Sequence, residues 1–179
     1  MKLRTNQYTL SFNDQLPDDI NDPEELIERI TKKITINSKA SNLNSVFPWV
    51  RLAEDTLERY SYLEGKSILN LRYHLGYVLF VMGNYNKSKI MIEKVIETYL
   101  EMDKVNNKVL SVLYFDYARI LVALSEYESA DSVMYDIYKL TKDSVIIISL
   151  WALIETHLKF FDLAEYHFKS AKKFIKKEV

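Results

Sequence analysis

The residues of this sequence that could bind a metal ion or transfer a proton are its three histidines and a few neighbouring carboxylates. His74, His157 and His167 include no two at the i, i+4 spacing that places a pair of metal ligands on one helix face. His157 follows Glu155 closely, but a single histidine on a helix surface is an ordinary solvated side chain. Cysteine is absent, which excludes a thiol nucleophile, a disulfide and a thiolate metal site.

Other catalytic arrangements are not found in the sequence either. A phosphate-binding loop needs clustered glycines, and the three glycines here are far apart: Gly65, Gly76 and Gly83. No serine lies in a glycine-flanked nucleophile motif. The acidic neighbours Glu54-Asp55, and Glu93 with Glu97, are typical of solvated helix faces. The sequence therefore predicts no catalytic residue, no metal site and no cofactor, and we expect a protein that is not an enzyme.

Composition and charge further restrict the kind of protein that this chain can be. The chain has 179 residues, of which 48% are hydrophobic and 27% charged, as in one globular domain or a short array of repeats. Its net charge of −1 gives no electrostatic drive toward nucleic acid or an anionic membrane. The longest apolar-rich run is 145–154, whereas a bilayer-spanning helix needs about 20 residues. No secretory signal core precedes residue 15, so we expect a cytoplasmic protein.

The spacing of apolar residues predicts a row of helices from Val46 to Val179. Asp22-Pro23-Glu24-Glu25 has the residue order of a helix start, and that helix is predicted to end near Thr35. The polar stretch 37–45 is predicted to be a loop, with Ser45 as the cap of a helix that ends near Gly65. Gly83-Asn84 predicts a turn between a helix over 67–82 and a second helix that begins at Tyr85.

A pattern of one aromatic or apolar residue, one small residue and two further apolar residues recurs along the chain. Its copies are Val50-x-x-Ala53-x-x-x-Leu57-x-x-Tyr60, Tyr85-x-x-Ser88-x-x-x-Ile92-x-x-Val95, Tyr127-x-x-Ala130-x-x-x-Met134-x-x-Ile137 and Phe161-x-x-Ala164-x-x-x-Phe168-x-x-Ala171. The small residues are separated by 35, 42 and 34 positions, and Ala118 and Ala152 take the place of Gly76 in later copies. Helix pairs at this period predict an α-solenoid, in which Gly76 lies at a close helix crossing.

The copy with Leu75-Gly76, Gly83-x-Tyr85 and Ser88 resembles the tetratricopeptide repeat (TPR) family. The resemblance covers about residues 45–179 and implies an all-α, TPR-like solenoid of three to four helix pairs. Residues 1–44 would form an N-terminal extension with an extended arm and one helix. The interval of 42 residues between Ser88 and Ala130 is expected to add about one turn to each helix that flanks 97–109. Repeats of this greater length resemble those of bacterial peptide-responsive regulators of the Rap and PlcR type.

The resemblance also implies a binding surface, because the first helix of each TPR pair lines a concave groove. The predicted partner-binding residues are Asn70, Tyr73, Tyr77, Phe80, Phe115, Arg119 and Leu153, with Val112, Val122, Ile146, Ser149 and Thr156 beside them. The lysines and asparagines of the family's clamp for chaperone C-termini are replaced by Tyr73, Tyr77, Asp116, Ile146 and Leu150, so we expect no such ligand. A partner's peptide or helix could occupy the groove, or the chain's own segment 7–12 could cover it.

The C-terminal helix offers a second surface. We expect it to bury Phe161, Ala164, Phe168, Ala171 and Ile175 against its pair. A second apolar stripe, formed by Leu163, Tyr166, Ser170 and Phe174, predicts an oligomer contact, with a two-fold homodimer as the commonest closed form. The lysines near the end of this helix complement the helix dipole and do not by themselves indicate nucleic acid.

Taken together, the sequence predicts a non-enzymatic protein- or peptide-binding scaffold, with no direct nucleic-acid or membrane contact, in a bacterial or phage regulatory pathway. Two alternatives remain open. One is a structural homo-oligomer assembled through its terminal helices. The other is a regulatory subunit that acts on a transcription factor. No helix-turn-helix is evident before Trp49, so contact with DNA would need a partner subunit.

Overall fold

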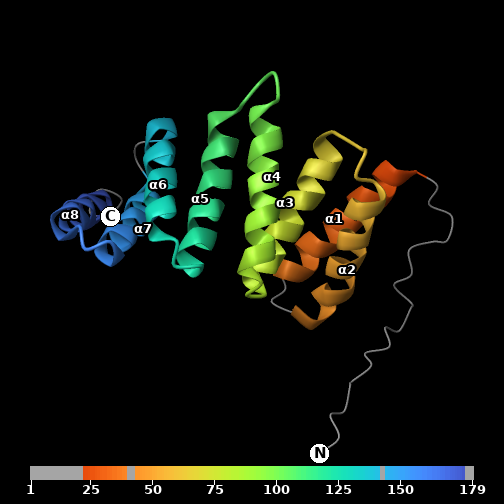
Figure 1. Ribbon diagram of the computed structural model, residues 1–179, viewed down its shortest axis with the longest axis horizontal. Helices are drawn as coiled ribbons and strands as arrows, with labels where there is room; N and C mark the ends of the chain where they lie inside the picture. Colours follow the sequence, from red (N-terminus) through yellow and green to blue (C-terminus); the bar gives the residue numbers. More distant parts are fainter. Residues whose placement is uncertain (1–21, 40–42, 142–143, 176–179) are drawn as a thin grey trace, which may run out of the picture. The chain divides into compact units, whose positions relative to one another are not determined.

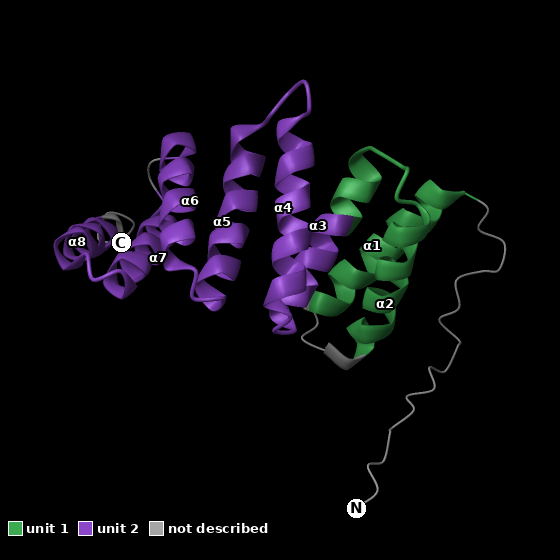
Figure 2. Cartoon of the chain, viewed as in Figure 1, with its two compact units in different colours: residues 1–71 green, residues 72–179 purple. Residues whose placement is uncertain are grey.

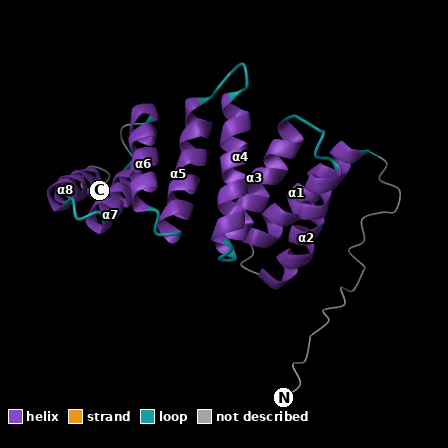
Figure 3. Ribbon diagram, viewed as in Figure 1, coloured by secondary structure: helices purple, strands orange, loops and turns teal. Residues whose placement is uncertain are grey.

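The computed structural model describes residues 22–39, 43–141 and 144–175, and all the regular secondary structure in these ranges is helical (Figures 1 and 3). The helices are α1 (Pro23–Lys39), α2 (Leu43–Arg59), α3 (Lys66–Val81), α4 (Tyr85–Leu100), α5 (Asn107–Ala123), α6 (Tyr127–Leu140), α7 (Val145–His157) and α8 (Phe161–Ile175). The all-α prediction is confirmed.

The chain divides into two compact units, residues 1–71 and 72–179, with the boundary inside α3 (Figure 2). In the first unit α1 packs against α2. Ile27, Ile30 and Ile34 form the buried stripe of α1, while Val46 and Ala53 are buried on α2. In the second unit α4 packs against α5, α5 against α6, α6 against α7, and α7 against α8. The division at residue 44 between an extension and a repeat domain stays a prediction.

The helix starts agree with the sequence at most positions. The Asp22 carboxylate accepts a hydrogen bond from the Glu24 N–H at 3.0 Å, as the capping pattern predicts. The predicted loop over 37–45 is wrong, because α1 continues to Lys39 and α2 begins at Leu43. Asn37 remains helical and its amide donates to the Lys33 carbonyl. Ser45 lies inside α2 and donates to the Asn37 side chain at 3.2 Å, so it is not a helix cap.

Small residues make the contacts between paired helices, as the repeat predicts. The Ser88 hydroxyl donates to the Gly76 carbonyl at 2.7 Å, which joins α4 to α3. A Cβ atom at Gly76 would lie 2.9 Å from Ile92 Cδ1 and 3.1 Å from Met91 Cβ. The small residues of the other copies are buried as well: Ala53, Ala118, Ala130, Ala152 and Ala164. The predicted register of the repeats is therefore confirmed.

The extra residues of the 42-residue interval between Ser88 and Ala130 are divided among α4, α5 and the connection between them. α5 begins 11 residues before Ala118, whereas α7 begins 7 residues before Ala152, so α5 carries one added turn. α4 ends 12 residues after Ser88 and α6 ends 10 residues after Ala130, so α4 gains about half a turn. The remainder lies in the connection 101–106, where the Asn106 side chain caps α5. The prediction of a full turn on each flanking helix is correct for α5 only.

The close approach at Gly76 predicts how larger residues there affect stability. Gly76→Leu should overpack the crossing and lower the free energy of unfolding by about 1–3 kcal/mol. Gly76→Ala should also destabilise the fold, by a smaller amount, because its Cβ meets the Ile92 side chain. Adding Ile92→Val removes the nearest atom and should recover part of that loss. Urea unfolding of the three variants tests this, and a Gly76→Leu midpoint equal to the parent's would contradict the crossing.

Candidate binding surface on α3 and α5

In the second unit, α3 and α5 bring together the central residues of the predicted groove wall. The Tyr73 hydroxyl on α3 donates to the Asp116 carboxylate on α5 at 2.8 Å. Asp116 also pairs with Arg119, one turn further along α5, with 3.2 Å between Arg119 Nη1 and Asp116 Oδ1. The two helices are thus joined by a polar bridge that sequence reasoning did not predict.

Arg119 lies against two aromatic rings. Its guanidinium carbon is 4.8 Å from the ring centre of Phe80 on α3 and 5.9 Å from that of Phe115 on α5. Cation–π attraction and the Asp116 ion pair together fix its orientation. The Arg119 side chain remains 36% exposed, so part of it is accessible to an incoming group.

Burial and Asp116 keep Tyr73 in its hydrogen-bond donor state. Burial raises the pKa of the Tyr73 hydroxyl well above its ordinary value, and the nearby Asp116 carboxylate raises it further. Tyr73 is therefore a neutral phenol at any physiological pH. Since the Asp116 carboxylate accepts bonds from both Tyr73 and Arg119, it holds an aromatic donor and a cation in fixed positions.

Several other residues of the predicted groove wall are exposed. Tyr77 on α3, Val112 on α5 and Leu153 on α7 are exposed. Asn70 is exposed too, but it lies in the first unit. The segment 7–12, which could have covered the groove, lies outside the described residues.

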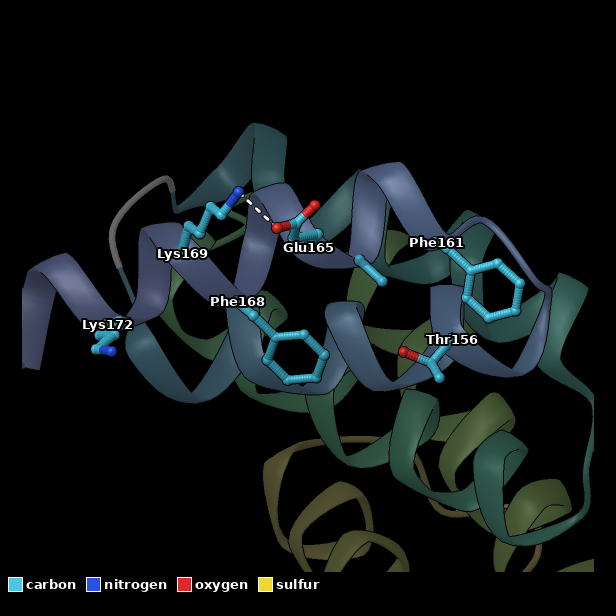
Figure 4. Close-up of a pocket in the computed structure, with 7 residues that line it drawn as sticks. Thr156, Phe161, Glu165, Phe168, Lys169 and Lys172 are labelled. Carbon is cyan, nitrogen blue, oxygen red and sulfur yellow. Dashed lines mark ion pairs between the residues drawn. The ribbon is translucent and has the colours of Figure 1, made fainter.

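The C-terminal helix departs from the prediction. Ala164 and Ala171 are buried as expected, but Phe161 is 62% exposed and Phe168 is 49% exposed. Both rings point along the side of α8 near Thr156 of α7 (Figure 4), where they border a hollow of about 400 Å³. The prediction that these two phenylalanines are buried is wrong, because only one narrow face of α8 meets α7. The side chain of Ile175 lies outside the described residues.

The predicted oligomer stripe lies on a different side of α8. Leu163 and Tyr166 are both exposed, at 52% and 65%. The side chain of Phe174, the last residue of the stripe, lies outside the described residues. The stripe therefore stays a prediction.

Comparison with known proteins identifies the fold. The sequence matches no protein-family model and no curated protein. Among solved structures, BtubC (BKLC) from P. vanneervenii has a TM-score of 0.76 at 10% identity, over 92% of this chain and 68% of that one. A Podosopora anserina putative kinesin light chain with nearly identical TPR-like repeats has a TM-score of 0.64 at 14% identity, over 87% and 88%. A double mutant of MamA RS-1 has a TM-score of 0.65 at 12% identity, over 86% and 75%.

The fold is TPR-like. At these identities the likeness establishes the architecture alone. In TPR-like terms, α3 and α5 are the first helices of consecutive pairs, and the Tyr73–Asp116 bridge links one pair to the next. Among the described helices, none is long and apolar enough to cross a bilayer.

The last TPR-like pair contains a polar network that sequence reasoning missed. Glu155 on α7 is only 2% exposed, and its carboxylate lies 2.7 Å from Nδ1 of His167 on α8. The His167 ring stacks on Trp151, whose Nε1–H donates to the Asp131 carboxylate on α6 at 2.7 Å. A glutamate three residues after the buried Ala152 was the available signal, because that spacing places it on the inner face of its helix.

This network predicts a pH effect on stability. Burial raises the pKa of Glu155 above its ordinary value of 4.5, Asp131 raises it further, and His167 opposes both. A carboxyl with a raised pKa binds its proton more tightly in the folded chain, so its contribution favours folding below pH 4.5 and is lost as the pH rises through the folded-state pKa. Glu155→Gln stays neutral and lacks this dependence. The melting temperature of the parent minus that of Glu155→Gln should therefore fall from pH 4.5 toward neutrality, and a rise over that range would contradict the assignment.

Proposed function

We propose that this protein is a non-enzymatic scaffold that binds a protein or peptide through the α3–α5 surface of its TPR-like array. The observation that supports this is the placement of Arg119, which lies against Phe80 and Phe115, is anchored by Asp116 and is partly exposed. Arginine and tyrosine are the side chains that most often dominate binding energy at protein interfaces. A cation already held in position loses little conformational entropy when a ligand binds.

The chemistry of the surface suggests what the ligand presents. Arg119 offers donors to a carboxylate or to a peptide carbonyl. Tyr77, one turn from Tyr73 on α3, and Val112, one turn from Asp116 on α5, are exposed and offer aromatic and aliphatic contact. A peptide or amphipathic helix with apolar anchors and one acceptor group fits this set. We place the scaffold in a cytoplasmic regulatory pathway of a bacterium or phage, without direct contact to nucleic acid or membrane.

A homodimer is the second proposal for this chain. The exposed Leu163 and Tyr166 support it, since adjacent apolar side chains on one face can bury each other in a two-fold contact. This contact would leave the α3–α5 surface free, so the two proposals are compatible.

The test of the binding proposal begins with affinity capture from the native host and identification of the captured protein. Binding of that protein to purified variants is then measured by titration calorimetry. Tyr77→Ala and Arg119→Ala should each weaken binding by about 1–4 kcal/mol, as truncation of an interface anchor does. Asp116→Asn should also weaken it, because Arg119 then loses the charge that fixes its orientation.

The matched control is Ile90→Ala, an exposed apolar side chain on α4. It should leave the affinity unchanged. If Tyr77→Ala and Arg119→Ala bind like the parent, the partner uses another surface and the proposal is wrong.

A further inference from the structure

We propose that the exposed side of α8 binds an amphipathic helix of a partner protein, one with an acidic first turn, an apolar stripe and an aromatic hydrogen-bond donor. This docking site is separate from the α3–α5 surface. It is the hollow beside α8, lined by Thr156, Phe161, Ala164, Glu165, Phe168, Lys169 and Lys172 (Figure 4).

In the preceding repeat, a helix covers the equivalent surface. A shift of 34 residues places Phe161, Glu165 and Phe168 at the positions of Tyr127, Asp131 and Met134 on α6, and there all three contact the following helix, α7. Tyr127 stacks on His157, with ring centres 4.3 Å apart. Asp131 accepts a hydrogen bond from Trp151. Met134 is fully buried in a cluster with Ile154. The same positions on α8 lie open, so the hollow has the residues of a helix-binding surface without its helix.

The repeat before that one contains a similar contact. Tyr117 on α5 donates a hydrogen bond to the Glu93 carboxylate on α4. Tyr117 and Trp151 occupy the same repeat position, directly before the buried Ala118 and Ala152. In both repeats, therefore, the following helix brings an aromatic donor to a carboxylate of the helix it covers. On α8 the available carboxylate is Glu165, an exposed group that pairs with Lys169 at 2.6 Å.

Charge identifies the end of the incoming helix that meets the lysines. Lys169 and Lys172 replace Tyr135 and Tyr138 of α6. α7 runs antiparallel to α6, since its last residue, His157, contacts the first residue of α6, while Trp151 contacts Tyr138 near the other end. A helix that covers α8 in the same way brings its N-terminal half to the lysines. Acidic residues in that first turn would pair with them and also complement the helix dipole.

Charge also disfavours a second copy of this chain as the occupant. Two antiparallel α8 helices centred on Glu165 about a two-fold axis would bring that carboxylate against its own counterpart instead of an aromatic donor. α1 does have an acidic first turn, but its apolar stripe of Ile27, Ile30 and Ile34 is already buried against α2. A partner helix with both features is therefore the better fit.

The probe is a fluorescent synthetic peptide based on α7, which covers the equivalent surface of α6. It has the sequence of residues 144–159 with Val145→Glu, Ile146→Glu and Leu153→Glu, so it keeps Trp151 and Ile154 and gains an acidic first turn. We expect saturable binding to the full chain by fluorescence anisotropy. Phe168→Glu or Phe161→Glu in the protein should weaken it by about tenfold or more. Lys172→Glu should weaken it and reduce its dependence on salt.

Three controls complete the experiment. Leu163→Glu, an equally exposed position on another side of α8, should bind the probe like the parent. A probe with lysines in place of the introduced glutamates should bind more weakly, and so should a probe with Trp151→Phe, which lacks the donor for Glu165. Circular dichroism confirms that each protein variant is folded, and Phe161→Glu is the safer variant because that ring is the more exposed.

The proposal is overturned if the probe fails to bind, or if the two phenylalanine variants bind it as the parent does. It is also overturned if the parent sediments as a dimer that Phe168→Glu dissociates, because the occupant is then a second copy. If Tyr77→Ala no longer binds the captured partner, binding of the probe to the hollow beside α8 is not affected. The two surfaces are therefore tested independently.

Discussion

The structure depends on the close contact of small residues where the two helices of a pair cross. Ser88 hydrogen-bonds to the backbone of Gly76 in one pair, and buried alanines take both positions in the next two pairs. A side chain at Gly76 would collide with Ile92, so the distance between α3 and α4 is fixed by the absence of one Cβ atom. Because packed interiors deform little, the spacing of each pair then sets where the next helix can lie.

The binding surface follows from the same register. Tyr77, Arg119 and Leu153 each come directly after the small residue of their helix, namely Gly76, Ala118 and Ala152. Successive residues on a helix point about 100° apart, so the residue after the crossing points to a different side of the helix from the small residue. The repeat thus turns equivalent positions outward on α3, α5 and α7. The identities at those positions, an aromatic ring and a cation held by Asp116, give the surface its chemistry.

The sequence predicted the features that depend on local spacing and failed where two helices had to be placed together. The buried small residues and the turn at Gly83 could be predicted, since each requires only one residue type at one position. The Tyr73–Asp116 bridge and the Glu155–His167 pair could not, because they depend on which turns of separate helices meet. The polar stretch after residue 37 misled for another reason: polar residues favour loops, but here Asn37 stays within α1 and its amide donates to the Lys33 carbonyl.

The central claim is that a protein partner binds the α3–α5 surface, and site-specific photo-crosslinking tests it most directly. A benzophenone side chain is introduced at Tyr77 or Val112, and at Ile90 on α4 as the comparison, in the full chain expressed in its native host. We expect positions 77 and 112 to crosslink to the same protein and position 90 not to do so. Crosslinks to that protein from position 90 alone, or equally from all three positions, would contradict the claim.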